Sequence, residues 1–198
     1  SYIGSTSTSG DGTYSYTGLA AGSYYLRTYN NQGYIDEVYD NVACPSSSCG
    51  SLPTVGTAVT VGAAGLTAGI DFDLAPGGVI SGRVTASAGG LGIANARVRV
   101  YTVAGSSLGN AYTDSNGDYT FSIGLPSGDY VVLVYQASGF IGEIYNDKVC
   151  INARCDRSTG TPVSVTAGTQ TTGIDFSLDA GGLVSGRVTK ASDGTGVD

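Results

Sequence analysis

The sequence contains a long internal repeat, and this repeat limits the architectures that the chain can adopt. "GTAVTVGAAGLTAGIDFDLAPGGVISGRVT" (Gly56–Thr85) aligns without gaps with "GTPVSVTAGTQTTGIDFSLDAGGLVSGRVT" (Gly160–Thr189). Farther upstream, residues 11–26 align with residues 116–133 once a short gap is allowed. The period of about 105 residues is the size of a domain rather than of a solenoid rung. The chain is therefore expected to consist of tandem domains.

The phase of the repeat divides the chain unevenly. "GGVISGRVT" opens a complete repeat, which we place at residues 77–180. Residues 1–76 then form a repeat that lacks its first two strands, and residues 181–198 provide the first strand of a further repeat. We expect this last segment to complete a neighbouring domain or subunit by strand addition. Trimming a longer array at an arbitrary point would leave the same ends, so both interpretations stay open.

Alternation of apolar and polar residues predicts about seven β-strands in the complete repeat. Val98 and Val100 fall on one face of residues 96–103, and two arginines fall on the other. Residues 129–136 are apolar on both faces, which is typical of a central strand. The other strands are expected at residues 79–85, 109–113, 118–122, 162–166 and 173–178. Seven short strands separated by turns match a β-sandwich.

Composition supports this fold class and excludes several classes of function. The 32 glycines and the charged fraction of only 13% are typical of an all-β, turn-rich protein. The net charge is −7 and the nine basic residues are scattered singly, so we expect no nucleic-acid partner. No apolar run approaches the ~20 residues that span a bilayer. Histidine, the commonest general base and zinc ligand, is absent, so we expect no enzyme and no cofactor.

Three stretches resemble the carboxypeptidase regulatory-like domain, a transthyretin-like (prealbumin-like) family: "GGVISGRVT", "ANARVRVYT" and "TDSNGDYTFSIGLPSGDYVVLV". They are more loosely similar to the B-type repeats of bacterial surface adhesins. The resemblance covers most of residues 79–134 and part of residues 11–29. It implies tandem seven-stranded, Ig-like or prealbumin-like β-sandwich domains, which are frequent in secreted and cell-surface proteins and usually lack catalytic residues. The chain departs from the family in carrying a cysteine-bearing stretch after the central strand.

Each repeat carries one C-x4-C pair, Cys44/Cys49 and Cys150/Cys155. A zinc site needs four ligands, so both pairs would have to meet across a whole domain. Redox cysteines usually occupy a C-x-x-C motif at the start of a helix. We therefore favour one local disulfide per repeat. By lowering the entropy of the unfolded chain, such a bond stabilises the fold by only ~2 kcal/mol. Such a bond shapes a protruding loop more than it holds the fold, and it places the protein outside the cell or at its surface.

The stretches "GYIDEVYDNVAC" and "GFIGEIYNDKVC" share a Gly, an aromatic residue, an Ile, a Glu and a Tyr. A glycosidase-like carboxylate pair is not kept, because Asp36 is replaced by Gly142. The tyrosines either pack within their own domain, oriented by the glutamate, or contact the next domain. We interpret the stretch as a rigid protrusion that braces one domain against the next. The candidate interface residues are Tyr34, Glu37, Tyr39, Phe140, Glu143 and Tyr145, together with Val184 and Val188 in the last segment.

One motif has oxygen-bearing side chains at alternate positions, as calcium ligands often have. It comprises Asp114, Asn116 and Asp118, and its counterpart in the first repeat, "SGDGT", loses most of these groups. Because Asn-Gly favours a tight hairpin, a turn explains both copies and calcium explains one at best. We therefore expect no metal here and keep calcium as the weaker hypothesis.

These patterns favour a structural subunit or segment of an extracellular bacterial filament, stalk or adhesin shaft. Its partner is then the protein itself, joined head to tail, or a tandem neighbour. The alternative is an accessory module of a secreted protein that binds carbohydrate or another surface, with exposed tyrosines stacking on surface glycans. The absence of Trp counts against this alternative.

Overall fold

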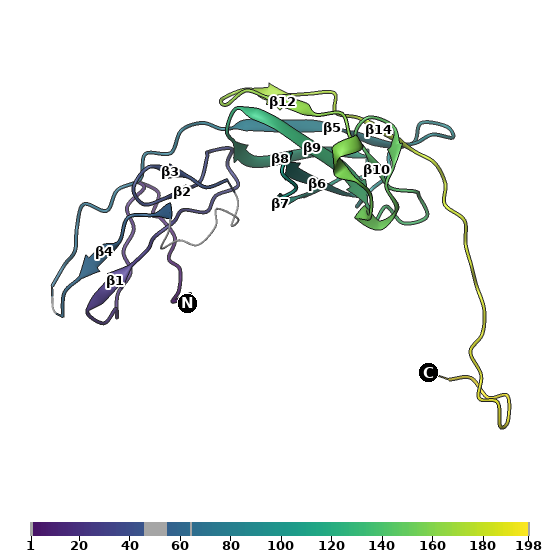
Figure 1. The fold of residues 1–198 in the computed structure, drawn as a ribbon, viewed down its shortest axis with the longest axis horizontal. Coiled ribbons are helices and arrows are strands. Elements are labelled where there is room, and N and C mark those ends of the chain that lie inside the picture. Colours follow the sequence, from purple (N-terminus) through teal and green to yellow (C-terminus); the bar gives the residue numbers. More distant parts are fainter. Residues whose placement is uncertain (1, 46–54, 64, 198) are drawn as a thin grey trace.

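The computed structural model describes residues 2–45, 55–63 and 65–197, and it shows an all-β protein. Its main body is a β-sandwich built from residues 77–180, called the central sandwich below. Residues 1–76 form the N-terminal segment, which carries smaller pieces of sheet beside the sandwich (Figure 1). Residues 181–198 form the C-terminal segment, which extends away from the sandwich (Figure 1).

Two sheets make up the central sandwich. The first follows the order β11-β10-β9-β6-β7, and β12 pairs with the remaining part of β9. Its strands are β6 (Arg97–Thr102), β7 (Ser107–Tyr112), β9 (Gly128–Tyr135), β10 (Glu143–Ile144), β11 (Lys148–Val149) and β12 (Val163–Val165). The second is organised around β5, which pairs antiparallel with β8 and parallel with β13 and β14. Its strands are β5 (Gly78–Ala86), β8 (Asp118–Leu125), β13 (Gln170–Thr171) and β14 (Phe176–Leu178).

The core lies between the two sheets and follows the predicted alternation. Val98 and Val100 of β6 are fully buried and face Ile80 and Val84 of β5 across one cluster of apolar side chains. Phe121 of β8 and Phe176 and Leu178 of β14 belong to the same cluster. Since β5 supplies side chains to this core and pairs with three other strands, it is the central element of its sheet.

The outer face of β9 is covered as well, by the stretch that contains the second cysteine pair. Leu133 and Tyr135 of β9 pack there with Ile144 and Cys150 in a second, smaller apolar cluster. Burial of β9 on both faces confirms its prediction as a central strand. Ile144 and Cys150 thus hold the first part of the cysteine-bearing stretch against the sheet, whereas Val149 and Ile151 are exposed, so its interpretation as a protrusion stays a prediction.

The N-terminal segment repeats local parts of the central sandwich. Strand β1 (Gly22–Tyr24) pairs with β4 (Val59–Val61), and β2 (Glu37–Val38) pairs with β3 (Val42–Ala43). These pairs are the counterparts of β9 with β12 and of β10 with β11. A long-range hydrogen bond is also repeated: the Tyr14 hydroxyl donates to Ile70 O at 2.6 Å, and that of Tyr119 donates to Ile174 O at 2.7 Å.

Candidate assembly site

The C-terminal segment has the sequence of β5 but none of its burial. Val184 is 98% exposed and Val188 is 71% exposed, whereas their counterparts in β5, Ile80 and Val84, are 0% exposed. Leu183 is also almost fully exposed. A row of apolar side chains that forms the centre of a core in one copy therefore faces solvent in the other.

The turn that follows β5 is nevertheless reproduced in the C-terminal segment. Val197 N donates to Val188 O at 3.0 Å, as Ile93 N donates to Val84 O at 2.9 Å. The isolated bridge between Thr189 and Gly196 likewise matches the bridge between Thr85 and Gly92. The local sequence alone thus forms the turn, whereas the residues before it, which correspond to β5, form no strand.

Glycines in β5 allow close backbone approach, and the C-terminal segment keeps them. A Cβ at Gly82 would lie less than 3 Å from the carbonyl of Ile174, and one at Gly78 less than 3 Å from the side chain of Val165. The counterparts, Gly186 and Gly182, have no atom within 4 Å of such a Cβ. Small residues are required where another chain segment approaches closely. Sequence analysis did not single out these two glycines, although the gapless alignment preserves them.

The N-terminal segment is open where the central sandwich is closed by β5. Tyr16 is 40% exposed, and its counterpart Phe121, which belongs to a strand paired with β5, is 1% exposed. The Asp175 carboxylate accepts a hydrogen bond of 2.8 Å from the backbone amide of Arg83 in β5. Within the described part of the chain, no such donor reaches the counterpart carboxylate of Asp71.

A short backbone junction joins the N-terminal segment to the central sandwich. Gly33 N donates to Ser122 O of β8 at 2.9 Å, and Gly77 N donates to Gly33 O at 2.7 Å. Tyr34 forms an isolated bridge with Pro76. The predicted interface residue Tyr34 therefore lies at this junction through its backbone, while its side chain is partly exposed.

The repeated tyrosines pack inside their own units. The ring of Tyr145 lies edge-on to Phe176 with ring centres 5.9 Å apart, and Tyr39 lies edge-on to Phe72 at 5.8 Å. Phe140 packs against the main core. These contacts favour the first of the two interpretations of the tyrosines, packing within the unit.

The repeated glutamates are buried in β2 and β10. One carboxylate oxygen of Glu37 and one of Glu143 have no hydrogen-bond partner among the described residues. Burial raises the pKa of Glu143, and the nearby charges of Asp147 and Asp179 raise it further. The pKa of Glu37 is raised in the same way, by burial first and then by Asp73 and Asp40. Among the hydrogen bonds of the described residues, none joins Tyr39 to Glu37 or Tyr145 to Glu143, so the structure does not show the expected orienting pair.

The second predicted disulfide is present. Cys150 and Cys155 are bonded, with their Cα atoms 5.1 Å apart, and Cys150 is fully buried. Cys44 is buried as well, but Cys49 lies outside the described residues, so the first disulfide stays a prediction.

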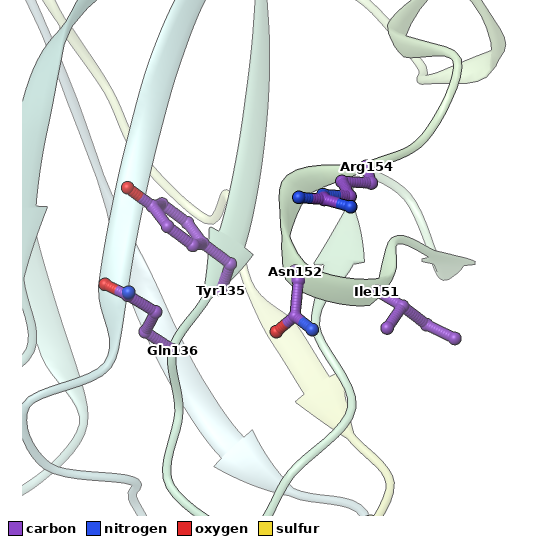
Figure 2. A pocket seen from close by; sticks show the side chains of 5 residues that line it. All are labelled: Tyr135, Gln136, Ile151, Asn152 and Arg154. Carbon is purple, nitrogen blue, oxygen red and sulfur yellow. The ribbon is translucent and has the colours of Figure 1, made fainter.

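Two adjoining cavities lie between the end of β9 and the disulfide loop. The first, of about 600 Å³, is lined by Tyr135, Gln136, Ile151, Asn152 and Arg154, and Figure 2 shows the side chains from the two sides of the cavity. Arg97 and Arg99 lie over the Tyr135 ring, 5.5 Å and 4.9 Å from its centre. The second cavity, of about 510 Å³, extends to Gly139, Phe140 and Gly181.

The calcium candidates form a hairpin turn. The Asp114 carboxylate accepts hydrogen bonds from the backbone amides of Asn116 at 2.8 Å and Asp118 at 3.0 Å. The Asp118 carboxylate lies 3.8 Å from the Arg83 side chain. In the described residues, no three His, Cys, Asp or Glu side chains are grouped as a metal site requires. The helical turns in these residues also lack the length and apolar character of a membrane-spanning helix.

Comparison with known proteins identifies one family. The profile of the carboxypeptidase regulatory-like domain matches residues 79–179. No curated protein matches the sequence. The solved structures that are similar to the chain share low identity with it. The 5-hydroxyisourate hydrolase of Klebsiella pneumoniae is 19% identical over 53% of this chain and 92% of its own, with a TM-score of 0.34.

Two more of the similar structures come from Streptococcus agalactiae and Bacillus anthracis. The minor pilin GBS52 of Streptococcus agalactiae is 16% identical over 88% of this chain and 66% of its own, with a TM-score of 0.38. The TIE protein of Bacillus anthracis is 16% identical over 87% of this chain, with a TM-score of 0.40, and the chain spans only 28% of its length.

Proposed function

Because the chain belongs to the carboxypeptidase regulatory-like domain family, we propose that it is a non-enzymatic structural protein of an extracellular fibre or stalk. Residues 77–180 are one complete sandwich, and residues 1–76 are a second sandwich that lacks its first two strands. Residues 181–198 supply the missing first strand to residues 1–76 of a second copy. A contact of this kind joins unlike surfaces and does not close, so it builds a linear polymer. The disulfide fits an oxidising, extracellular location.

The exposed valines of the C-terminal segment carry this proposal. Two positions that are fully buried in β5 are 98% and 71% exposed at their counterparts in the C-terminal segment, Val184 and Val188. Exposed apolar rows of this kind are usual at sites of association. Gly182 and Gly186 add a second argument. Because they have no Cβ, the segment can lie against the backbone of a partner.

The N-terminal segment has the complementary features. Tyr16 and Phe72 are incompletely covered where a β5 strand would lie, although their counterparts, Phe121 and Phe176, are buried. In the proposed assembly, the backbone amide of Arg187 donates to the Asp71 carboxylate, as Arg83 donates to Asp175. The two segments together span one repeat except for the counterpart of residues 95–105.

The substitution Gly186→Val tests the proposal. A valine is free of contacts in the separate chain but would meet the carbonyl of Ile70 in the partner, by analogy with Gly82 and Ile174. We expect the unaltered chain to form linear polymers in electron micrographs and sedimentation experiments, and the variant to remain monomeric. Ser192→Val is the matched control, because Ser192 lies in the turn beyond the strand, where its counterpart Ala88 is exposed. Polymers of the Gly186→Val variant as long as those of the control would contradict strand donation.

A second candidate function rests on the cavity in Figure 2. Its lining combines the Arg154 guanidinium with the amides of Gln136 and Asn152 and the ring of Tyr135, a set suited to an acidic sugar. Glycan-array binding by the whole chain, lost on Arg154→Ala, would favour this carbohydrate-binding function. Absence of binding would leave the structural one.

A further inference from the structure

We infer that the edge formed by Gly139, Phe140 and Gly181 binds residues Thr17–Gly18–Leu19 of a second copy of this chain. These residues and their counterparts at the end of β8 are called the corner below. The inference rests on the proposed function and adds to it a second contact between subunits, separate from the donated strand. This contact would copy the junction inside the chain, and so would set the angle between one subunit and the next.

The junction inside the chain shows both sides of such a contact. On one side, Gly33 and Tyr34 present their backbone, and Gly77 N donates to Gly33 O. On the other side lies the corner at the end of β8, where Ser122 O accepts a hydrogen bond of 2.9 Å from Gly33 N. The approach is close, because a Cβ at Gly124 would lie less than 3 Å from the backbone of Tyr34.

The first side of the junction is rebuilt at the other end of the central sandwich. Gly181 N donates to Gly139 O at 2.8 Å, as Gly77 N donates to Gly33 O at 2.7 Å. Phe140 bridges with Ala180, as Tyr34 bridges with Pro76. Gly139 has a φ of 83°, nearly the same as the 82° of Gly33. The backbone that receives the β8 corner is therefore already in place at this end.

The second side of the junction is missing at this end. Among the described residues, the amide of Gly139 has no acceptor, whereas that of Gly33 donates to Ser122. A cavity of about 510 Å³ extends along Gly139, Phe140, Gly142 and Gly181. An unpaired backbone amide that becomes buried costs free energy, so a partner that covers this edge must bring an acceptor.

The N-terminal segment of a second copy carries the matching corner. "TGL" (Thr17–Leu19) aligns with the end of β8, where Gly18 corresponds to Gly124 and Leu19 to Leu125. No atom lies within 4 Å of a Cβ at Gly18, so this glycine is open in the separate chain. A carbonyl of this corner would accept the hydrogen bond from Gly139, as Ser122 accepts it from Gly33. Neither surface carries a charged side chain that would oppose the contact.

Hydrogen–deuterium exchange of the assembled chain tests the inference. The Gly139 amide is expected to exchange at least tenfold more slowly in the polymer than in the Gly186→Val monomer, because it gains an acceptor there. Amides of residues 183–189 report strand donation in the same experiment. Slow exchange at residues 183–189 with unchanged exchange at Gly139 would overturn the inference and leave the proposed function standing. Unchanged exchange at both places would overturn both.

The substitution Gly18→Ala tests the corner contact independently of strand donation. A methyl group there would meet the backbone of Phe140 in the partner, by analogy with Gly124 and Tyr34. We expect this variant to lose the protection of Gly139 and to associate at least tenfold more weakly. Gly69→Ala is the matched control: its φ of 75° is close to the 80° of Gly18, and its counterpart Gly173 is also open. Equal association of the two variants would contradict the inference.

Discussion

Two glutamates at equivalent positions, Glu37 and Glu143, are buried in short strands of the two cysteine-bearing stretches. Each has a carboxylate oxygen without a hydrogen-bond partner in the described structure, and burial raises the pKa of both. A buried charge without full hydrogen bonding opposes folding. The shared glutamate therefore does not stabilise the fold at neutral pH. It should make the free energy of unfolding depend on pH.

The free energy of unfolding is expected to rise as the pH falls from 7 towards the range in which glutamates titrate in the unfolded chain. The raised pKa means that folded Glu143 binds its proton at a higher pH than the unfolded chain does. Its favourable contribution is complete below the unfolded pKa and is lost as the pH rises through the folded pKa. Urea unfolding between pH 4.5 and 7.5 measures this slope.

Glu143→Gln is the corresponding variant. It should be more stable than the unaltered chain at pH 7, by on the order of 1 kcal/mol, because the buried charge at this position is removed. It should also have a flatter pH profile. Asp156→Asn is the control, because hydrogen bonds from Ser158 lower the pKa of Asp156 and give it the opposite pH dependence. An unchanged slope in Glu143→Gln would show that another group causes the effect.

Gly82 and Gly186 form a second informative pair of residues. Gly82→Val should destabilise the central sandwich by about 3 kcal/mol, since overpacking against a fixed backbone forces strands apart. Gly186→Val should leave the free energy of unfolding of the monomer unchanged, since its side chain meets nothing there. Thermal unfolding of both variants distinguishes the two positions. Equal losses of stability would mean that the C-terminal segment is already packed within its own chain.

At the scale of elements, each strand expected from alternation overlaps an observed one, including the three-residue strands β12 and β14. The two-residue period is clearest in β5, β6, β8 and β9, which are among the longest of these strands. The two-residue strands β10 and β11 have no such period, and their position depends on tertiary packing. The inner and outer faces of β6 also followed from alternation.

The assembly site was predictable only in part. The exposed valines followed from the phase of the repeat, because Val184 and Val188 align with residues of a core strand. The return of the disulfide loop onto β9 did not, since the sequence shows that Leu133 and Tyr135 need cover but not which segment provides it. The junction at Gly33 and Gly139 was also missed as a hydrogen-bonded contact, because it is made by backbone atoms, which carry no side-chain signal.

The Cys150–Cys155 disulfide is expected to stabilise one loop rather than the whole sandwich. Replacing both cysteines with serine should lower the free energy of unfolding by ~2 kcal/mol at most, because the bond closes a short loop. Trypsin should then cut faster after Arg154, which lies inside the loop. Cleavage after Arg83 in β5 is the internal control and should not change. Unfolding of the complete sandwich in this variant would show that the bond is essential to the fold.

The C-terminal segment should tolerate charge as long as the chain is monomeric. Val184→Asp with Val188→Asp is expected to change the free energy of unfolding of the monomer by less than about 0.5 kcal/mol, since both side chains are exposed. The same double variant should fail to polymerise, because the donated strand would bury two carboxylates. Sedimentation velocity measures the second effect. If the double variant polymerised at the same concentration as the unaltered chain, these valines would not enter the core of a partner.

At the scale of the whole molecule, the chain has complementary features at its two ends. The C-terminal segment extends away from the central sandwich (Figure 1) and exposes apolar side chains, and in the N-terminal segment Tyr16 is 40% exposed where its counterpart Phe121 is buried. If the subunit contact copies the junction inside the chain, every step along the polymer has nearly the same geometry. In the proposed assembly, two local contacts, the donated strand and the corner at Gly139, would then build a regular fibre.

Disulfide trapping between two copies tests strand donation most directly. In the central sandwich, Ser81 of β5 lies opposite Thr120 of β8, and their counterparts are Ser185 and Ser15. Opposite residues of antiparallel strands lie within reach of a disulfide. Chains carrying Ser15→Cys and chains carrying Ser185→Cys are mixed and mildly oxidised. A crosslinked dimer is expected for this pair, with little or none when Ser192→Cys replaces Ser185→Cys. Equal crosslinking of both pairs, or none with Ser185→Cys, would contradict strand donation.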